Sequence, residues 1–503
     1  MIATIRLRML LALLLIALLQ IHTVARSIKS TLGFIDNKRV VELDPSVQHV
    51  PLDPAKAHLR PPPPQIPSSF DIFVGLSVFR DGFRCGKTIF TGIKRAKYPE
   101  RLFFGVVDQV NTGDERCLDE YCKMAEAEWP DKGLCPYKDH IRVDLRSAFE
   151  SRGPTLARHQ QQKLLKQEEF CLQLDGHSIF TNLWDENLLA DWKQADNEMA
   201  VLSTYLHHMH DFVLENGDNA INAELPHLCS TIRDRNDIIR NDGASLIRDS
   251  KYPQLQALWA AGLSFSKCHA ERRVLVDSHT LWMFDGEEFL RASRLWTNGY
   301  DIYSPSEMGS VIYHNYTRPS VTYDRMKVDP RVKAREKEMG KHRFYHIVGK
   351  PVKGMIDTYE LDKYGFGSVR SFKTYLNFSG VTFQEGVKDK DSCKQLHWVP
   401  YENATEIEAL MENGWKLQGL AADVRAEKSA NFSDDEGLAR SKARLRQELV
   451  DTGTAKGPSA TPVWLFMFVV VAVLFVTLSN DSVYRSIQLT FYARWPRKNS
   501  SKE

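Results

Sequence analysis

The chain has 503 residues, enough for one large or two ordinary domains with a substantial core. Its 66 Lys and Arg residues nearly balance 64 Asp and Glu residues, which leaves a formal net charge of +2. This balance excludes the strong overall positive field that nucleic-acid-binding proteins use. The charged residues are therefore expected to act locally, at particular sites.

Residues 1–26 are predicted to form a signal peptide or a short signal anchor. Residues 9–21 are almost entirely Leu, Ile and Ala, and Arg6 and Arg8 precede them. Small residues follow in Thr23-Val-Ala25, as signal peptidase requires. Cleavage at this point leaves a single membrane span in the protein, whereas a retained segment gives two.

A stem is predicted for residues 27–69, followed by a compact domain at 70–400. The stem is polar and ends in Arg60-Pro-Pro-Pro-Pro64, which favours a stiff, extended chain. The domain begins with an apolar strand, a helix and a second apolar strand, at residues 70–79, 85–97 and 102–107. This order and spacing predict a βαβ unit of a parallel sheet.

The same alternation continues to residue 175. A short strand at 140–144 and a long polar helix at 153–169 lead to an apolar strand that ends at Asp175. Ligands bind beyond the carboxyl ends of the strands in parallel sheets. We therefore expect one site to form where three turns converge, after Val78, Val107 and Leu174.

The remaining organisation is less regular. We expect helices and loops over 190–319, mixed and charged segments over 320–400, and a helical or partly disordered linker over 401–461. Residues 462–479 are uncharged and rich in Val, Phe and Leu, close to the roughly 17-residue lower limit for a transmembrane helix. The tail at 480–503 is basic, so the positive-inside rule predicts that it is cytosolic.

This orientation predicts that the body of the protein lies in the lumen of the Golgi or the endoplasmic reticulum. Two buried core helices are the alternative interpretation of the terminal apolar runs. Each run, however, lies at a chain end with basic flanks, which favours membrane segments.

Cysteines and glycosylation sequons fit a luminal body. Eight cysteines can pair in an oxidising compartment, and the local cluster of Cys117, Cys122 and Cys135 is the most readily bridged. A zinc site there is the weaker alternative, because no second short-spaced pair follows. Four sequons would be accessible in the lumen if exposed, at Asn315, Asn377, Asn403 and Asn431, whereas Asn499 falls on the cytosolic side.

Two Asp-x-His pairs are candidate metal ligands. Asp175-Gly-His177 ends the apolar run at 170–174, and Asp277-Ser-His279 follows the apolar run at 274–276. A carboxylate and an imidazole at this spacing can bind one divalent cation, which in turn can hold a nucleotide diphosphate. An ordinary turn with a surface histidine is the alternative for either pair, and spacing does not decide between them.

Further blocks resemble the eukaryotic polypeptide N-acetylglucosaminyltransferases, which are related to the mucin-type polypeptide GalNAc-transferases. The donor-site block comprises Ala157-Arg158, Glu168 to His177 and Trp184-Asp-Glu186. Other matching blocks follow the family's order, at residues 73–80 with Cys85, 200–205 as a helix, 260–265, 285–288, 294–301, 313–314, 364–370 and 375–380. The resemblance covers about residues 70–385.

This resemblance implies a nucleotide-diphospho-sugar (GT-A-like) α/β fold with a Rossmann-like parallel front half. It implies UDP-GlcNAc as the donor, Mn²⁺ as the cofactor, and retaining transfer to a hydroxyl of threonine, serine or hydroxyproline in a protein. It selects Asp175 and His177 over the second pair as metal ligands, with His314 as the third. The membrane segments shift the expected acceptor to secretory-pathway proteins. Gly176 stands where relatives often have serine, which loosens the turn but removes no ligand.

Further site residues are predicted within the same blocks. Glu287 and Glu288 are catalytic candidates, with stabilisation of a helix N-terminus as the alternative role. The nucleotide-binding candidates are Ser77, Arg80, Asp108 and Arg158, and surface salt bridges are the alternative for the arginines. The acceptor-binding candidates, for which core packing is the alternative, are Trp282, Phe284, Trp296 and Tyr300.

Three alternative functions stay open at this point. The chain can use another UDP-sugar, it can glycosylate a glycan or a lipid, or it can be a transferase-derived binding protein without turnover. The sequence contains no Gly-x-Ser-x-Gly elbow, no His-Glu-x-x-His helix and no Walker-type phosphate loop. A glycosyltransferase is therefore the leading interpretation.

Overall fold

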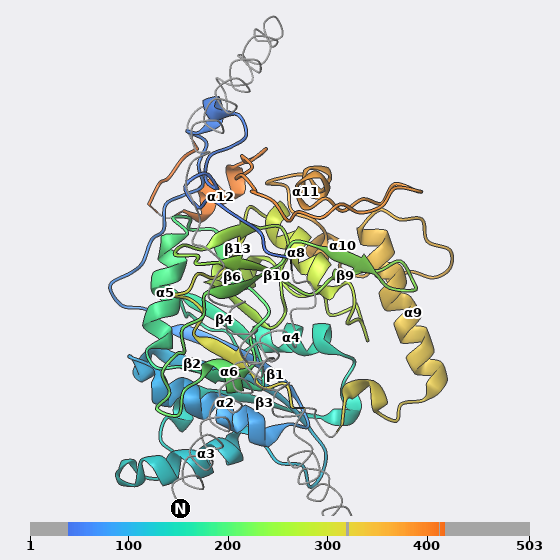
Figure 1. Ribbon diagram of the computed structural model, residues 1–503. Coiled ribbons are helices and arrows are strands. Elements are labelled where there is room, and N and C mark those ends of the chain that lie inside the picture. The colour runs from blue at the N-terminus through green and yellow to red at the C-terminus, as the bar shows by residue number, and fades with distance from the viewer. Residues whose placement is uncertain (1–38, 318–320, 412, 418–503) are drawn as a thin grey trace, which may run out of the picture. The chain divides into compact units, whose positions relative to one another are not determined.

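The computed structural model describes residues 39–317, 321–411 and 413–417 (Figure 1). The predicted signal segment, transmembrane segment and basic tail lie outside the described residues, as do Asn431 and Asn499. Within the described ranges, no helix combines the length and apolar character needed to cross a membrane.

A mixed eight-stranded sheet forms the centre of the domain, in the order β11-β13-β6-β12-β4-β1-β2-β3. These strands are β1 Ile72–Phe79, β2 Leu102–Val110, β3 Ile141–Ser147, β4 Phe170–Asp175, β6 Ala200–Ser203, β11 Gln254–Gln256, β12 Leu263–Lys267 and β13 Asp301–Ser304. Three strand pairs, β4 with β1, β1 with β2, and β2 with β3, are all parallel. The predicted parallel front half is confirmed, because the apolar runs that predict it are the buried strands.

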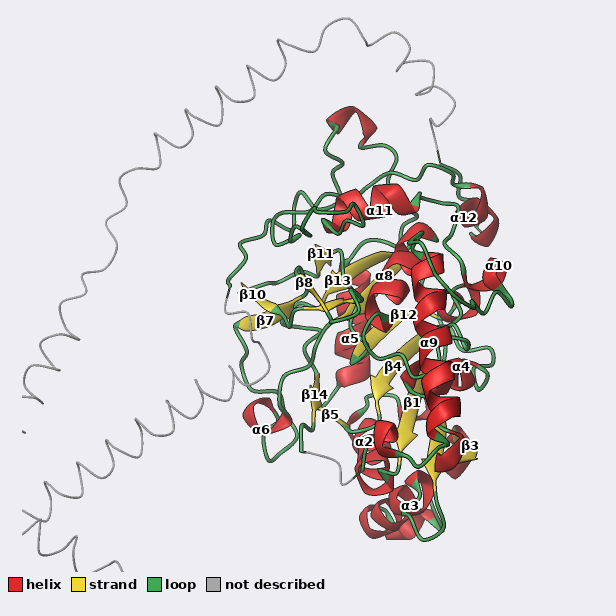
Figure 2. Ribbon diagram, turned by 90° about the vertical axis from the view of Figure 1, so that its right-hand side faces the viewer, coloured by secondary structure: helices red, strands yellow, loops and turns green. Residues whose placement is uncertain are grey.

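Helices and small two-stranded sheets surround this sheet (Figure 1). The helices are α2 Gly82–Arg95, α3 Cys117–Glu128, α4 Pro154–Gln162, α5 Trp184–Gln194, α6 Met209–Phe212, α7 His269–Arg273, α8 Glu287–Thr297, α9 Pro330–Ile347, α10 Leu361–Tyr364, α11 Phe372–Ser379 and α12 Thr405–Leu410. The small sheets pair β7 Glu224–His227 with β10 Ser245–Arg248, β5 Ser178–Phe180 with β14 Ile312–His314, and β8 Thr231–Arg233 with β9 Ile239–Asn241. The long helix α9 lies at the outer side of the domain, at the right of Figure 1 and toward the viewer in Figure 2.

The alternation of side chains along β1 and β4 separates two packing layers. One face of β1 packs on α2 through a large apolar cluster that includes Ile72, Leu76 and Ile89. The opposite face is turned to α4, where Gly75 is so close to Gln161 that an added Cβ would overlap its side chain. Successive side chains of a strand point to opposite faces. The side chains on this second face, near the carboxyl ends of β1 and β4, therefore point toward α4.

The region 190–319 differs from the expectation of helices and loops, because it contributes half of the central sheet. Residues 200–205, which the resemblance predicts as a helix, instead begin with strand β6. Val201 and Leu202 pair with β12 on one side and with β13 on the other. Strand pairing on both sides satisfies the backbone of this short apolar run, so tertiary contacts override its local resemblance to a helix.

The described part of the predicted stem packs against the domain. Val41 donates its backbone N–H to Leu246, and the Gln48 side chain hydrogen-bonds the backbone of Pro253 and Leu255. Leu59 is buried in the second apolar cluster, which also contains residues of α12. Residues 39–69, 401–411 and 413–417 therefore belong to the folded body: Gln48 hydrogen-bonds β11, and Tyr401 hydrogen-bonds Gly299 just before β13.

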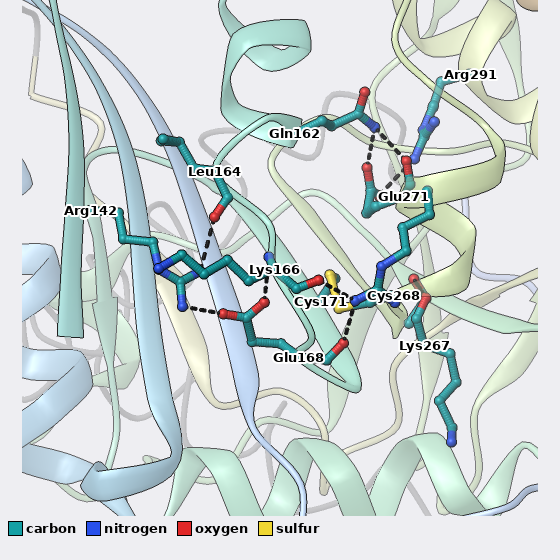
Figure 3. Close-up of a disulfide and its surroundings, with 12 residues drawn as sticks. Arg142, Gln162, Leu164, Lys166, Glu168, Cys171, Lys267, Cys268, Glu271 and Arg291 are labelled. Atoms are coloured by element: carbon teal, nitrogen blue, oxygen red, sulfur yellow. Dashed lines mark hydrogen bonds and ion pairs between the residues drawn. A yellow bond between two sulfur atoms is a disulfide. The ribbon is translucent and has the colours of Figure 1, made fainter.

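All eight cysteines form disulfides, in the pairs Cys85–Cys117, Cys122–Cys135, Cys171–Cys268 and Cys229–Cys393. The predicted local bridge is confirmed for Cys122 and Cys135, whereas Cys117 reaches from α3 to α2. Figure 3 shows the bond that joins β4 to the start of α7, beside the ion pair of Arg142 and Glu168. Four cross-links stabilise the fold mainly by restricting the unfolded chain.

Candidate active site

The candidate site lies where the strand order reverses, between β1 and β4. β1 has β2 as its parallel neighbour on one side and β4 on the other. Ser77 and Asp175 stand in register at the carboxyl ends of these two strands. Such a switch point opens a crevice outside the strand ends, which is where open α/β sheets bind ligands.

Three predicted metal ligands converge at this crevice. Asp175 ends β4, His177 follows in the turn, and His314 ends β14, which pairs with β5 directly after that turn. One ligand atom from each residue lies within 4.8 Å of the other two. Within the described ranges, this is the group of His, Cys, Asp or Glu side chains whose geometry suits a metal ion.

The donor set fits a divalent cation of borderline hardness, such as Mn²⁺, because it combines a carboxylate with two imidazoles. His314 is buried, and its Nδ1 has no hydrogen-bond partner in the described part of the chain. Its Nε2 lies 3.4 Å from Asp175 Oδ2. The residues thus provide ligands that the protein itself does not fully satisfy.

Neighbouring groups keep Asp175 in its charged form. Burial acts to raise the pKa of Asp175, but the hydrogen bond with His314 and the charges of His177 and Arg158 hold it well below its usual range. The side chain of Asp175 is still 32% exposed, so solvent reaches the carboxylate. Burial lowers the pKa of His314, which favours the neutral imidazole that metals bind.

Arg158 joins the metal ligands to the helix α8. Its guanidinium lies 3.4 Å from Asp175 Oδ1 and forms a buried ion pair with Glu287. Glu287 is the first residue of α8, and Gly286 immediately precedes it with a φ of 92°. Glycine suits this position, because a side chain there would be strained and its Cβ would lie 2.7 Å from Ile238. Burial raises the pKa of Glu287, and Arg158 opposes that shift.

Glu288 is engaged by its own surroundings. Its carboxylate accepts hydrogen bonds from the Tyr205 hydroxyl at 2.6 Å, the Asn241 amide at 3.1 Å and the backbone N–H of Ala261 at 2.9 Å. Burial raises the pKa of Glu288 to about 7, although the hydrogen bonds from Tyr205 and Ala261 oppose the shift. These contacts favour a structural role for Glu288 and leave Glu287 as the stronger catalytic candidate.

The predicted nucleotide-binding residues are in different environments. The Ser77 hydroxyl donates to Gln161 at 2.8 Å, and Arg80 forms two 2.7 Å hydrogen bonds to Asp114. Both lie at the carboxyl end of β1 and are partly exposed. Asp108 is fully buried. One of its carboxylate oxygens accepts the backbone N–H of Cys117 at the start of α3, and the other has no hydrogen-bond partner in the described part of the chain, so its role in nucleotide binding stays a prediction. Burial raises the pKa of Asp108 to about 6.

The four aromatic candidates divide into two groups. Trp296 and Tyr300 both lie buried in the second apolar cluster, with Trp296 against Phe378, which favours the core-packing alternative for these two residues. Trp282 is largely buried and donates its Nε1–H to Glu336 at 2.7 Å. Phe284 is 67% exposed, and both Trp282 and Phe284 line a surface groove of about 570 Å³. Acceptor binding by Trp282 and Phe284 stays a prediction.

The competing Asp277-Ser-His279 pair is closed by other side chains. Asp277 is buried and accepts a 2.7 Å hydrogen bond from Arg343, which is also buried. His279 faces Asp357, with 2.8 Å between Nδ1 and Oδ2. Both members have protein partners, so this pair is part of the structural framework.

Several residues near the site were not singled out by sequence reasoning. Asp81 lies 3.3 Å from His177 Nδ1, and Arg84 pairs with Asp81. Burial and the charge of Glu287 raise the pKa of Tyr323, which is close to the carboxylate. The sequence Arg80-Asp-Gly82 marks the end of the first strand. It does not indicate that Asp81 contacts His177, because that histidine comes from a distant segment.

Comparison with known proteins identifies one family. The profile described as "Glycosyltransferase (GlcNAc)" matches residues 71–131 and 122–385. No curated protein matches the chain.

Some solved structures show a low similarity. GalNAc-T7 with UDP, GalNAc and Mn²⁺ has a TM-score of 0.39 and 16% identity over 62% of this chain, which spans 57% of the length of that protein. The Staphylococcus aureus TarS fragment 1-349 with UDP-GlcNAc has a TM-score of 0.32 and 13% identity, over 58% of this chain and 78% of that one. The mannosyltransferase PcManGT from Pyrobaculum calidifontis, with GDP-Man and Mn²⁺, has a TM-score of 0.30 and 14% identity, over 78% of this chain and 85% of that one. These TM-scores are too low to inform the chemistry.

Proposed function

The chain belongs to the glycosyltransferase (GlcNAc) family, and we propose that it is a metal-dependent, retaining enzyme that transfers GlcNAc from UDP-GlcNAc to a protein hydroxyl. The acceptor is a threonine, serine or hydroxyproline of a secretory-pathway protein. The observation that carries the proposal is the convergence of Asp175, His177 and His314 at the switch point of the sheet. A GT-A-like assignment of the fold belongs to the same proposal.

Asp175, His177 and His314 would hold a divalent cation, which when bound neutralises the negative charge of the departing diphosphate. Neutral imidazoles carry no charge, so the single carboxylate would cancel only one of the two positive charges of a bound divalent cation. The occupied site would keep a net positive charge, which suits a diphosphate. Arg158 adds a fixed positive charge beside Asp175.

The proposed reaction exchanges two bonds at the anomeric carbon of the sugar. The bond from this carbon to the β-phosphate oxygen of UDP breaks, and a bond to the acceptor oxygen forms on the same face. The acceptor proton passes to the leaving phosphate. Glu287 is proposed to hydrogen-bond the sugar or the acceptor, and Arg158 would hold that carboxylate in place.

The paired cysteines support the proposed luminal location. All eight form disulfides, which persist in the secretory pathway and are rare in the cytosol. Two of the sequons, Asn377 and Asn403, are exposed. A Golgi or endoplasmic reticulum membrane protein with a luminal catalytic domain and a cytosolic tail fits these features.

The test is a transfer assay on the purified full-length protein in detergent. UDP-GlcNAc, Mn²⁺ and peptides containing threonine, serine or hydroxyproline are incubated with the enzyme, and the glycosylated product is measured by mass spectrometry. We expect transfer that stops on chelation of the metal and falls steeply in Asp175→Asn. Because His279 belongs to the closed pair, His279→Asn is the matched control and should keep its activity.

Absence of both peptide transfer and slow donor hydrolysis, with no effect of Asp175→Asn on UDP binding, would contradict the proposal. Glycan and lipid acceptors in parallel reactions test the acceptor class, and UDP-sugars other than UDP-GlcNAc test the donor.

A further inference from the structure

Asp81 occupies the position just before helix α2, yet its carboxylate does not cap that helix. An aspartate at this position usually accepts a hydrogen bond from a backbone N–H of the first turn. Asp81 makes no such bond. Instead its side chain, only 15% exposed, is directed toward the turn that carries His177.

The contact with His177 has a specific chemical consequence. Asp81 Oδ2 lies 3.3 Å from His177 Nδ1. A carboxylate that accepts the Nδ1 proton fixes the tautomer in which Nε2 carries the lone pair. It also restricts rotation of the ring and leaves Nε2 as the nitrogen that can bind a metal.

Arg84, one turn along α2, holds Asp81 and connects it to the third ligand. Its Nε donates to Asp81 Oδ1 at 2.8 Å, and its Nη2 lies 2.6 Å from Oδ2. Its Nη1 donates to the carbonyls of Asn315 at 3.2 Å and Thr317 at 2.6 Å, in the segment that follows His314. The Asn315 N–H in turn donates to the carbonyl of His177 at 2.9 Å.

One aspartate and one arginine thus link two ligand-bearing segments that are more than a hundred residues apart in the sequence. From this geometry we propose that Asp81 and Arg84 are positioning residues of the metal site. Asp81 orients the imidazole of His177, and Arg84 holds both Asp81 and the His314 segment. The inference rests on the proposed metal-dependent function.

A purely structural ion pair at the start of α2 would affect folding but not metal affinity. The chain offers a matched pair for this comparison. Arg233 and Asp389 form two hydrogen bonds of 2.7 and 2.8 Å, with side-chain exposures of 22% and 11%, close to the 12% and 15% of Arg84 and Asp81. Neither Arg233 nor Asp389 is part of the site.

The experiment measures Mn²⁺ binding to the full-length protein in saturating UDP, by electron paramagnetic resonance of free Mn²⁺. Asp81→Asn should weaken binding roughly 10- to 100-fold, as is typical for loss of a partner of a metal-binding histidine. Arg84→Lys should weaken it by about tenfold, because lysine cannot form the two-pronged contact. Asp389→Asn should bind Mn²⁺ as the wild type does.

Transfer kinetics supply a second measurement. If the pair only positions ligands, the transfer rate of Asp81→Asn should approach that of the wild type at saturating Mn²⁺, and Asp81→Glu should recover part of the lost affinity. Wild-type affinity in Asp81→Asn, or an equal loss in Asp389→Asn, would overturn the inference while leaving the proposed function intact. Failure of the wild-type protein itself to bind Mn²⁺ would instead overturn the metal-dependent function, and the inference with it.

Discussion

The two Asp-x-His pairs of this protein have the same spacing and opposite environments. Asp175 and His177 lie at the end of a central parallel strand, with a second histidine from β14 facing them. Asp277 and His279 are instead paired with Arg343 and Asp357. The two pairs therefore differ in their partners: Arg343 and Asp357 engage the second pair, whereas the first pair faces another candidate metal ligand.

The charged neighbours of Asp175 and Asp277 also differ. Arg158 contacts both Asp175 and Glu287, so its single positive charge is shared between two carboxylates and does not fully balance the charge of Asp175. Arg343 donates from Nε directly to Asp277 and from Nη1 to the carbonyls of Asp357 and Tyr359. The carboxylate of Asp175 therefore keeps negative charge that a cation can bind, whereas the charge of Asp277 is balanced by Arg343.

The largest expected effect is on transfer in Asp175→Asn. Loss of the only carboxylate among the three candidate ligands removes electrostatic stabilisation of the leaving diphosphate. We expect the transfer rate to fall about 1,000-fold, which corresponds to roughly 4 kcal/mol of barrier. A thermal unfolding curve close to that of the wild type should accompany this loss. A large drop in stability instead would show that Asp175 is part of the framework, as Asp277 is.

The next effect is on stability in Asp277→Asn. This change leaves the buried guanidinium of Arg343 without its closest charged partner. Loss of one member of a buried ion pair costs about 3 kcal/mol or more, which chemical denaturation should reveal as a lower midpoint. The folded fraction should transfer sugar at the wild-type rate. Loss of activity without loss of stability would reverse the roles assigned to the two pairs.

A smaller effect is expected for Glu287→Gln, which tests the residue that Arg158 connects to Asp175. Glutamine keeps the size of the side chain but removes its charge. We expect the transfer rate to fall about 10- to 100-fold, the range for loss of a hydrogen bond to a charged group. Steady-state kinetics with Mn²⁺ affinity as the control separate this effect from a loosened metal site. An unchanged transfer rate would favour the alternative role of Glu287, stabilisation of the N-terminus of α8.

The last effect is a pH dependence of stability at Asp191, a buried aspartate that, unlike Asp175 and Asp277, forms its hydrogen bonds with a serine. Burial raises the pKa of Asp191 to about 7, although hydrogen bonds from the Ser306 hydroxyl and N–H oppose the shift. The folded state therefore keeps this proton in a range where the unfolded chain, in which the carboxyl has its ordinary pKa of 3.8, has lost it. Stability is greatest at low pH for this group and declines as the pH rises toward 7, by at most about 1.4 kcal/mol per pH unit.

Asp191→Asn should flatten that decline. The measurement is the free energy of unfolding at several pH values between about 4 and 7, for the wild type and the variant. Identical slopes in the two proteins would mean that Asp191 is ionised in the folded state despite its burial.

Local sequence patterns determined the front half of the domain. The apolar runs that became β1, β2 and β4 each lie between clear turn signals, and helix α2 fills the interval between the first two. Such strands are buried on both faces, so their hydrophobicity is continuous and easy to recognise. Asp175 could be assigned to the ligand-binding edge because strand direction alone defines that edge.

The back half could not be predicted in the same way. β6, β11 and β13 are strands of three or four residues, and they pair with residues 46 to 101 positions away in the sequence. Short runs like these carry too little periodicity to distinguish strand from helix. The burial of Trp296 has the same origin, because Tyr375 and Phe378 pack against it from a distant segment.

For the site, the sequence by itself supplied the candidate ligands and, through the ordered blocks of a family, the preference for Asp175 over Asp277. Only the tertiary structure decided which candidates share a space: it brought His314 to Asp175, enclosed Asp108, and placed Asp81 and Arg84 between the two histidine segments. The physical reason is that metal ligands and buried charges are satisfied by partners distant in sequence. No local pattern encodes that distance.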